Sequence, residues 1–109
     1  MRADVVRGAD ARFIPLGGGV SRCVLANSPG LMTVEVRFEE GAVGAVHSHP
    51  HLQNTYVLRG RFRFTVGGEA VEVGPGDTLA FPEDVPHGTE CLEAGALLDV
   101  FSPARADFL

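Results

Sequence analysis

The side chains of this chain best suited to binding a metal ion are concentrated in two segments. Within residues 47–53 the sequence contains His47, His49, His51 and Gln53, and the fourth and last histidine, His87, comes much later. Neutral imidazole is the commonest protein ligand of transition metals. We therefore predict that the two segments meet around one divalent transition metal ion, such as nickel, zinc, manganese, iron or cobalt.

The spacing of the first segment requires a bend in the chain. In a regular strand His47 and Gln53 would lie roughly 20 Å apart, whereas ligand bonds are only about 2 Å long. Pro50 is the natural place for a kink, because it fixes its own φ and cannot donate to a ladder. His49 then binds beside His47, Gln53 returns to the ion, and His51 at the kink is the least suitable ligand. The alternative is a set of ordinary surface or core histidines, which their grouping disfavours.

Composition limits the classes of function. The 109 residues, 45% hydrophobic and 21% charged, suit one compact globular domain. The net charge of −5 argues against nucleic acid or an anionic membrane as the partner, so an anionic substrate needs local positive charge. Residues 1–10 contain no apolar run long enough for a signal peptide or a membrane span. A cytoplasmic location is the resulting prediction.

The two cysteines, Cys23 and Cys91, are far apart and form no CxxC motif. We interpret them as reduced, small, buried apolar residues. A disulfide or a redox role remains the alternative.

The pattern of turns indicates an all-β fold. Glycine and proline recur every few residues without helical periodicity, which favours a barrel or a sandwich. Turns are expected at residues 27–30, 67–68 and 93–95, and residues 102–109 form a tail too short for a packed helix. The loop 82–86 delivers His87. The expected strands cover residues 12–16, 20–26, 31–38, 55–58, 61–66, 69–73, 78–81, 88–92 and 97–101.

The two metal-binding segments resemble the two motifs of the cupins. The first motif, residues 41–60, is matched by Gly41, His47, His49, Gln53 and Gly60, and the second, residues 76–91, by Gly76, Pro82, Asp84, His87 and Cys91. The resemblance implies a single cupin domain over residues 1–109, which is a jelly-roll barrel or double-stranded β-helix. It also implies that the metal ligands are His47, His49, Gln53 and His87.

Three positions depart from the motifs: Gln53 replaces a glutamate, Asp84 a glycine and Cys91 an asparagine. The first changes the chemistry, because four neutral donors leave the ion its full charge. Such an ion is a good Lewis acid and anchor for a carboxylate, and it is less suited to oxygen chemistry. Alternatively, Gln53 only forms hydrogen bonds near the metal.

Within the cupins, the run from His47 to Gln53 and residues 98–109 resemble the KdgF-type pectin-degradation proteins. Members of that family open the ring of 4,5-unsaturated monouronates from pectin or alginate breakdown to the linear 5-keto-4-deoxyuronate. Asp99, Phe101 and Arg105 match its site residues, so the resemblance implies an isomerase that acts on a small anionic sugar.

The residues themselves leave this role open. Strand alternation puts Asp99 on one face with Phe101, but that face can be the inner or the outer one. Taken alone, Arg105 reads as a surface arginine and Phe101 as a core residue.

Two rival functions are a cupin dioxygenase or other metal oxidoreductase, and a non-catalytic cupin that binds a sugar or metabolite. The first predicts bound iron and oxygen consumption, which Gln53 disfavours. The second predicts binding without turnover. Because small cupins usually pair, the resemblance also implies a homodimer.

Overall fold

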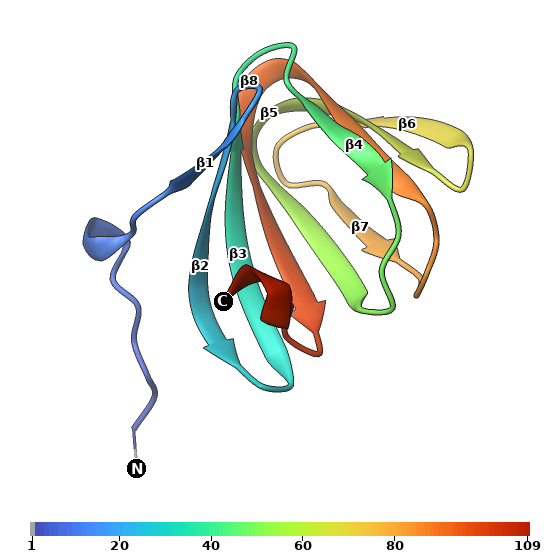
Figure 1. The fold of residues 1–109 in the computed structure, drawn as a ribbon. Coiled ribbons are helices and arrows are strands. Elements are labelled where there is room, and N and C mark those ends of the chain that lie inside the picture. Colours follow the sequence, from blue (N-terminus) through green and yellow to red (C-terminus); the bar gives the residue numbers. More distant parts are fainter. Residues whose placement is uncertain (1) are drawn as a thin grey trace.

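The computed structural model describes residues 2–109, which form eight antiparallel strands and two short 3-10 helices (Figure 1). No helix in this part of the chain is long and apolar enough to cross a membrane. The elements are η1 (Gly8–Asp10), β1 (Ile14–Gly17), β2 (Val20–Ser28), β3 (Leu31–Phe38), β4 (Val43–His47), β5 (Leu52–Val66), β6 (Glu69–Val73), β7 (Thr78–Phe81), β8 (His87–Ser102) and η2 (Ala106–Phe108).

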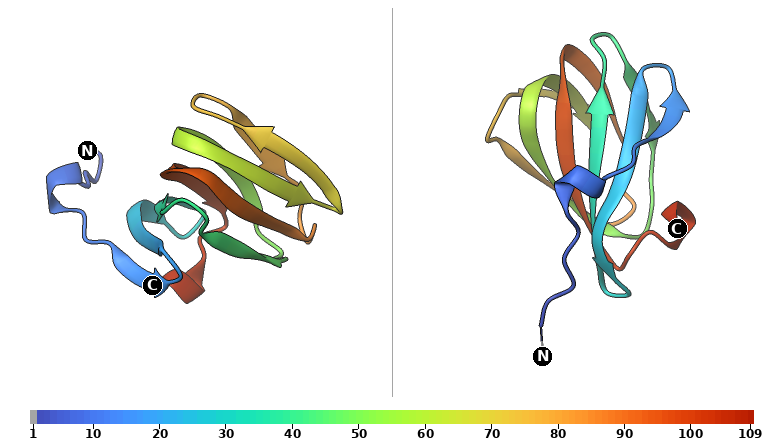
Figure 2. Two further views of the ribbon diagram at one scale, coloured as in Figure 1. Left: turned by 90° about the horizontal axis from the view of Figure 1, so that it is seen from above. Right: turned by 90° about the vertical axis from the view of Figure 1, so that its left-hand side faces the viewer.

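Two long strands, β5 and β8, organise the sheet and pair with each other along most of their length. β8 pairs with β4 through its first half and with β3 through its second. β5 pairs with β7 and then with β6. Each long strand thus changes its second partner along its length, and the sheet curls around an interior (Figure 2). The predicted all-β fold, in which the sheet curls into a barrel, is confirmed.

The turn expected at residues 93–95 does not form, and the strands expected on either side of it are one strand, β8. Likewise, the strands expected at 55–58 and 61–66 are parts of β5. The reason is the close approach of two glycines. A Cβ on Gly60, which has a φ of 84°, would lie 2.8 Å from the Cα of Gly95. Both strands bend at these glycines, and the register of their pairing shifts there. The two strands nevertheless remain paired on either side of the bend.

The predictions for the shorter elements differ from the structure mainly at their ends. Strands 31–38, 69–73 and 78–81 are confirmed. β1 begins two residues later than expected, and β2 extends to Ser28, which pairs with Leu31, so the turn there is only Pro29–Gly30. The tail forms one 3-10 turn, and its Phe108 packs against Phe101.

The interior consists of two apolar clusters. The larger is built around residues such as Phe62, Phe64 and Val57. The smaller contains Met32, Val34 and Phe101, and the tail packs against it. Both cysteines are buried and free, as predicted.

Candidate metal centre and active site

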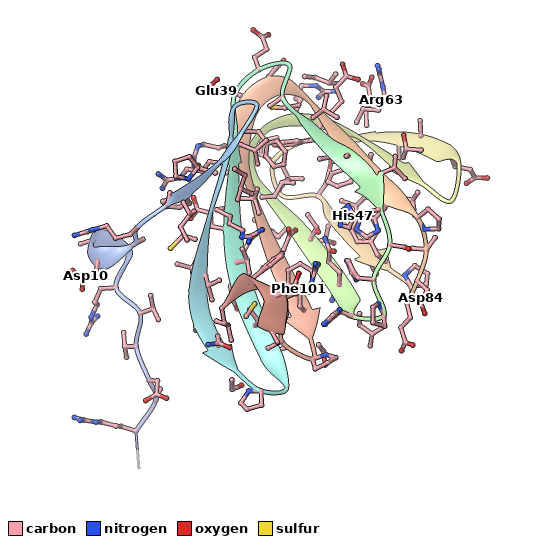
Figure 3. The ribbon with its side chains drawn as sticks, viewed as in Figure 1. Asp10, Glu39, His47, Arg63, Asp84 and Phe101 are labelled. Carbon is pink, nitrogen blue, oxygen red and sulfur yellow. The ribbon has the colours of Figure 1, made fainter. Side chains whose placement is uncertain are left out.

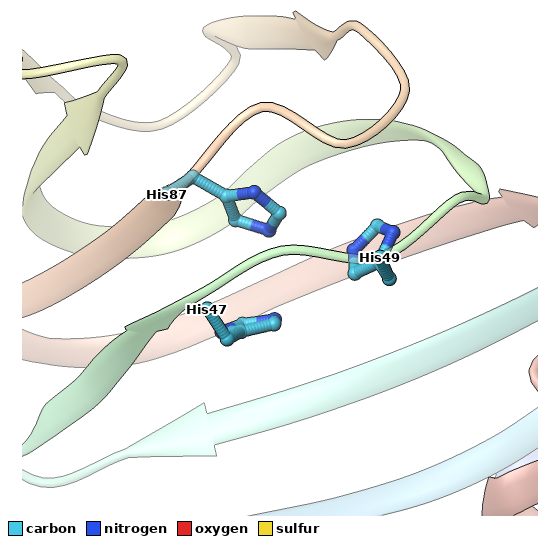
Figure 4. Close-up of side chains that lie close together, drawn as sticks. All are labelled: His47, His49 and His87. Carbon is cyan, nitrogen blue, oxygen red and sulfur yellow. The ribbon is translucent and has the colours of Figure 1, made fainter.

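The strand register brings the predicted histidines together from distant parts of the sequence. His47 ends β4 and is paired with His87, which begins β8. His49 follows on the stretch between β4 and a bend at residues 50 and 51, after which β5 begins (Figure 4). Ring centroids are 4.6 Å apart for His47 and His87, 5.0 Å for His49 and His87, and 5.6 Å for His47 and His49. His51 lies in the bend, as predicted, and outside the group of three.

Backbone carbonyls set the tautomer of all three rings. Nδ1 of His47 lies 2.9 Å from the carbonyl oxygen of Ala45. In His49 and His87, Nδ1 lies 3.0 Å from the carbonyl oxygen of a residue two positions away. A carbonyl can only accept, so each Nδ1 carries the proton and each Nε2 offers a lone pair.

The three rings can therefore act as neutral ligands. One ligating nitrogen from each ring lies within 4.8 Å of the others. Burial is the largest cause that lowers the pKa of both His49 and His87, which keeps these rings neutral. Nε2 of His87 is buried without a hydrogen-bond partner among residues 2–109. An unpartnered buried acceptor is costly, and a shared cation would satisfy it. The residues present fit a metal ion.

Gln53 points its side-chain oxygen at the same place. Oε1 of Gln53 lies 3.0 Å from Nε2 of His49. Since Nδ1 of His49 carries the proton, these two atoms are both acceptors and would repel each other with nothing between them. Two ligands with bonds near 2.1 Å at a right angle would be about 3 Å apart, which is the separation seen.

Thr55 fixes the orientation of that amide. Its hydroxyl donates to Oδ1 of Asp99 at 2.7 Å and accepts from Nε2 of Gln53 at 2.9 Å. An ionised carboxylate only accepts, so the direction of the chain of hydrogen bonds is set from Asp99 outward. The amide nitrogen of Gln53 consequently faces Thr55, and its oxygen faces His49.

Asp99 faces the interior, which settles the question that strand alternation left open. It is paired with Thr55 of β5 and with Val34 of β3. Burial raises the pKa of Asp99 to about 6, against the opposing effect of the hydrogen bonds from Thr55 and Gln53. A carboxyl group with a pKa in this range can both accept and return a proton near neutral pH.

The other two predicted site residues lie at the same cavity. Phe101 is 3% exposed, and its ring centroid is 5.7 Å from that of His49 (Figure 3 labels Phe101 and His47). Arg105 lies in the tail, with Cζ 5.3 Å from the centre of the Phe101 ring. Its guanidinium forms two hydrogen bonds with Asp107, at 3.0 and 2.9 Å.

The cavity has a volume of about 180 Å³. This is smaller than the roughly 300–1,000 Å³ of sites for drug-sized ligands, so it suits a small ligand. His49 contributes to the metal group without lining the cavity. Predicted site residues that line it are His47, Gln53, His87, Asp99, Phe101 and Arg105.

Sequence reasoning missed three residues at this site: Thr55, Arg22 and Phe108. Thr55 could have been found, because it follows Gln53 by two residues on the same face of one strand. Arg22 and Phe108 gave no comparable signal. They come together only because the tail folds back to β2, where Cζ of Arg22 lies 3.8 Å from the centre of the Phe108 ring.

Comparison with known proteins supports one family. Residues 34–101 match the family model described as "Cupin domain". The chain is 42% identical over 96 residues to the pectin degradation protein KdgF of Dickeya dadantii, covering 86% of this chain and 87% of that protein.

Two solved structures are similar over almost the whole chain. The structure of KdgF from Halomonas sp. has a TM-score of 0.94 and 34% identity, covering 99% of this chain and 100% of that one. An RmlC-like cupin from Shewanella frigidimarina has a TM-score of 0.94 and 38% identity, covering 99% and 97%.

Proposed function

Since the chain belongs to the cupin family and is a relative of the pectin degradation protein KdgF, we propose that it opens the ring of 4,5-unsaturated monouronates. The substrates come from pectin or alginate breakdown, and the product is the linear 5-keto-4-deoxyuronate. The observation that carries this proposal is the placement of Asp99. A half-buried carboxyl group with a pKa raised to about 6 lines the same cavity as metal-binding histidines, as acid–base catalysis requires.

The metal ligands in this proposal are His47, His49, Gln53 and His87. When bound, the ion supplies Lewis-acid polarisation of a substrate oxygen. Hydrogen bonds from Nδ1 to carbonyl oxygens support the three histidines as ligands, and the 3.0 Å contact with Nε2 of His49 supports Gln53. A carboxylate ligand would stabilise oxidised iron, whereas Gln53 supplies a neutral amide. The ligand set therefore favours ring opening over oxygenase chemistry.

Asp99 is the general base. It takes the proton of the anomeric hydroxyl while the C1 carbonyl forms and the bond from C1 to the ring oxygen breaks. The ring oxygen becomes an enolate oxygen on C5, and transfer of the proton from Asp99 to C4 gives the C5 ketone and frees Asp99. Arg105 binds the carboxylate or the developing enolate oxygen, and Phe101 packs against the sugar ring. Their place on the cavity of Asp99 supports these roles.

The decisive experiment combines metal analysis of the purified protein with an ultraviolet assay on unsaturated galacturonate. We expect about one divalent ion per chain and loss of the conjugated-alkene absorbance faster than the spontaneous reaction. Removal of the metal with a chelator should abolish the acceleration, and adding back nickel, zinc, manganese, iron or cobalt one at a time should identify the ion that restores it. Ligand binding without turnover, or oxygen consumption with bound iron, would refute the proposal in favour of a binding protein or an oxygenase.

A homodimer is also part of the proposal. The outer face of β5 exposes Leu52, Tyr56 and Leu58, and apolar side chains grouped on a sheet face are typical of an interface. Light scattering should give twice the chain mass of 11.5 kDa. Tyr56→Lys should shift the protein toward the monomer, whereas Val71→Lys on the exposed part of β6 should not. A monomeric wild-type protein would contradict this.

We place the reaction in the cytoplasm. Cys23 and Cys91 are both free thiols, and the cytoplasm is the compartment in which thiols stay reduced. Fractionation of cells that produce the native protein tests this location.

A further inference from the structure

Arg22 occupies an unusual position on the inner face of β2. Its neighbours on that face are apolar, because Val20 packs against the larger core cluster and Val24 against the smaller. Arg22 itself is only half-buried and lines the same cavity as Asp99. A cationic side chain between two inward-facing valines loses part of its hydration. Its charge therefore needs a partner that compensates this loss.

Among residues 2–109, the guanidinium of Arg22 has no acidic partner. None of the ion pairs or side-chain hydrogen bonds found within residues 2–109 includes it. The guanidinium stacks on Phe108, whose ring centre lies 3.8 Å from Cζ. Stacking uses the flat face of a guanidinium and leaves the N–H groups at its edge available for a planar anion.

Arg105 differs from Arg22 in this respect, although both contact the same aromatic ring. Cζ of Arg105 lies 4.4 Å from the ring centre of Phe108. Two of its N–H groups already bind Asp107, so its charge is largely balanced. Arg22 therefore supplies the unbalanced positive charge at the cavity, in a chain whose net charge is −5.

We propose that Arg22 binds the carboxylate of the sugar through the edge of its guanidinium and thereby selects acidic over neutral sugars. Phe108 holds the guanidinium in place. Arg105 then binds the ring oxygen, which becomes the enolate oxygen. This assignment rests on the proposed ring-opening function, because it identifies the group that recognises the acidic part of the same substrate.

The test compares the binding of two stable sugars, galacturonate and galactose, by isothermal titration calorimetry of the metal-loaded protein. Arg22→Met keeps an unbranched side chain against Phe108 and removes the charge. We expect its affinity for galacturonate to fall by about 10- to 100-fold, the range for a hydrogen-bonded charge, with no change for galactose. With unsaturated galacturonate, KM should rise by a similar factor while kcat stays within about twofold.

Arg37→Met is the matched control. Arg37 is also stacked on an aromatic ring, with Cζ 3.7 Å from the centre of Phe13, but it lies outside the cavity. This variant should bind galacturonate like the wild type. Arg22→Lys is a second test variant, which keeps the charge but loses the planar fork and should show an intermediate loss. Metal content and thermal unfolding of every variant should match the wild type.

Three results would overturn the role of Arg22. They are unchanged galacturonate affinity in Arg22→Met, an equal loss for galactose, and a wild-type protein that does not prefer galacturonate over galactose. Failure of the proposed function gives a different result, because galacturonate would then bind through Arg22 without any turnover of the unsaturated uronate. Normal turnover with unchanged affinity in Arg22→Met would refute only the role of Arg22.

Discussion

Both halves of β5 pair with β8, but the side chains that they direct into the barrel differ in kind: polar in the first half and aromatic in the second. The first half directs Gln53 and Thr55 inward, and both are buried. The second half directs Phe62 and Phe64 inward to the larger core cluster. Buried polar groups are costly unless hydrogen-bonded, and the first half meets this cost with a chain of hydrogen bonds that ends at Asp99.

This contrast separates stability from chemistry within one strand. Substitutions in the first half should change metal binding and turnover more than folding. Substitutions in the second half should do the reverse. Four experiments test this division and the hydrogen-bonded group that ends at Asp99 on β8, beginning with the largest expected effect.

Asp99→Asn should reduce kcat/KM by about 10²–10⁴-fold, because the amide cannot accept the proton of the anomeric hydroxyl. The ultraviolet assay on unsaturated galacturonate measures this loss. Metal content should be unchanged. Glu69→Gln is the control, since Glu69 is exposed on β6 and does not line the cavity. Near-normal turnover in Asp99→Asn would remove Asp99 from the mechanism.

Phe62→Ala should lower the free energy of unfolding by about 3–5 kcal/mol, because it leaves a cavity in the core. Phe62 is 0% exposed and contacts Phe38 edge-on, at 5.3 Å between ring centroids. Urea unfolding measures the effect. Val43→Ala, on the outer face of β4 where the side chain is 62% exposed, should change stability by less than about 0.5 kcal/mol. Equal losses in the two variants would contradict the contrast between inner and outer faces.

Asp99 should also make stability depend on pH in the metal-free protein. Its pKa is about 6 in the folded state, above the ordinary value of 3.8. The folded protein thus binds more protons between these values, and this contribution to stability is lost as pH rises through about 6. Asp99→Asn removes the dependence, so its stability relative to the wild type should increase by at most about 3 kcal/mol between about pH 4 and pH 7. A difference that does not vary with pH would refute the assigned pKa.

Thr55→Val should weaken metal binding by about 10- to 100-fold, the usual effect of losing a group that orients a ligand. The valine cannot accept from the amide of Gln53, so the amide loses its fixed orientation. Titration against a chelator of known affinity measures the change. Thr55→Ser keeps the hydroxyl and should bind metal like the wild type. If the two variants have equal affinities, the hydroxyl has no orienting role.

The sequence predicted the parts of this structure that depend on local patterns. The kink near Pro50, the group of three histidines and the alternation of β3 were all visible, because each depends on a few neighbouring residues. The continuity of β8 through Gly95 was not predicted, since glycine next to polar residues normally indicates a turn. Only the opposing Gly60, distant in sequence, makes a bend possible there.

The same limit applies to the site. Asp99 could be placed inward only by resemblance to a family, because alternation does not say which face is inside. The pairing of Thr55 with Asp99 depends on the register of two strands, and the two residues are 44 positions apart in the sequence. Contacts with the tail, such as that between Arg22 and Phe108, could not be predicted, because they form only when the tail folds back to β2.

The carbonyl groups that orient the histidines have a further consequence. Each belongs to a residue two positions from its own histidine, so the protonation pattern of the rings is encoded in two short peptides and does not depend on the rest of the barrel. Segments 45–51 and 85–87, transferred together onto another pair of adjacent antiparallel strands, would carry their tautomers with them. The recipient scaffold would have to supply only the spacing between the strands.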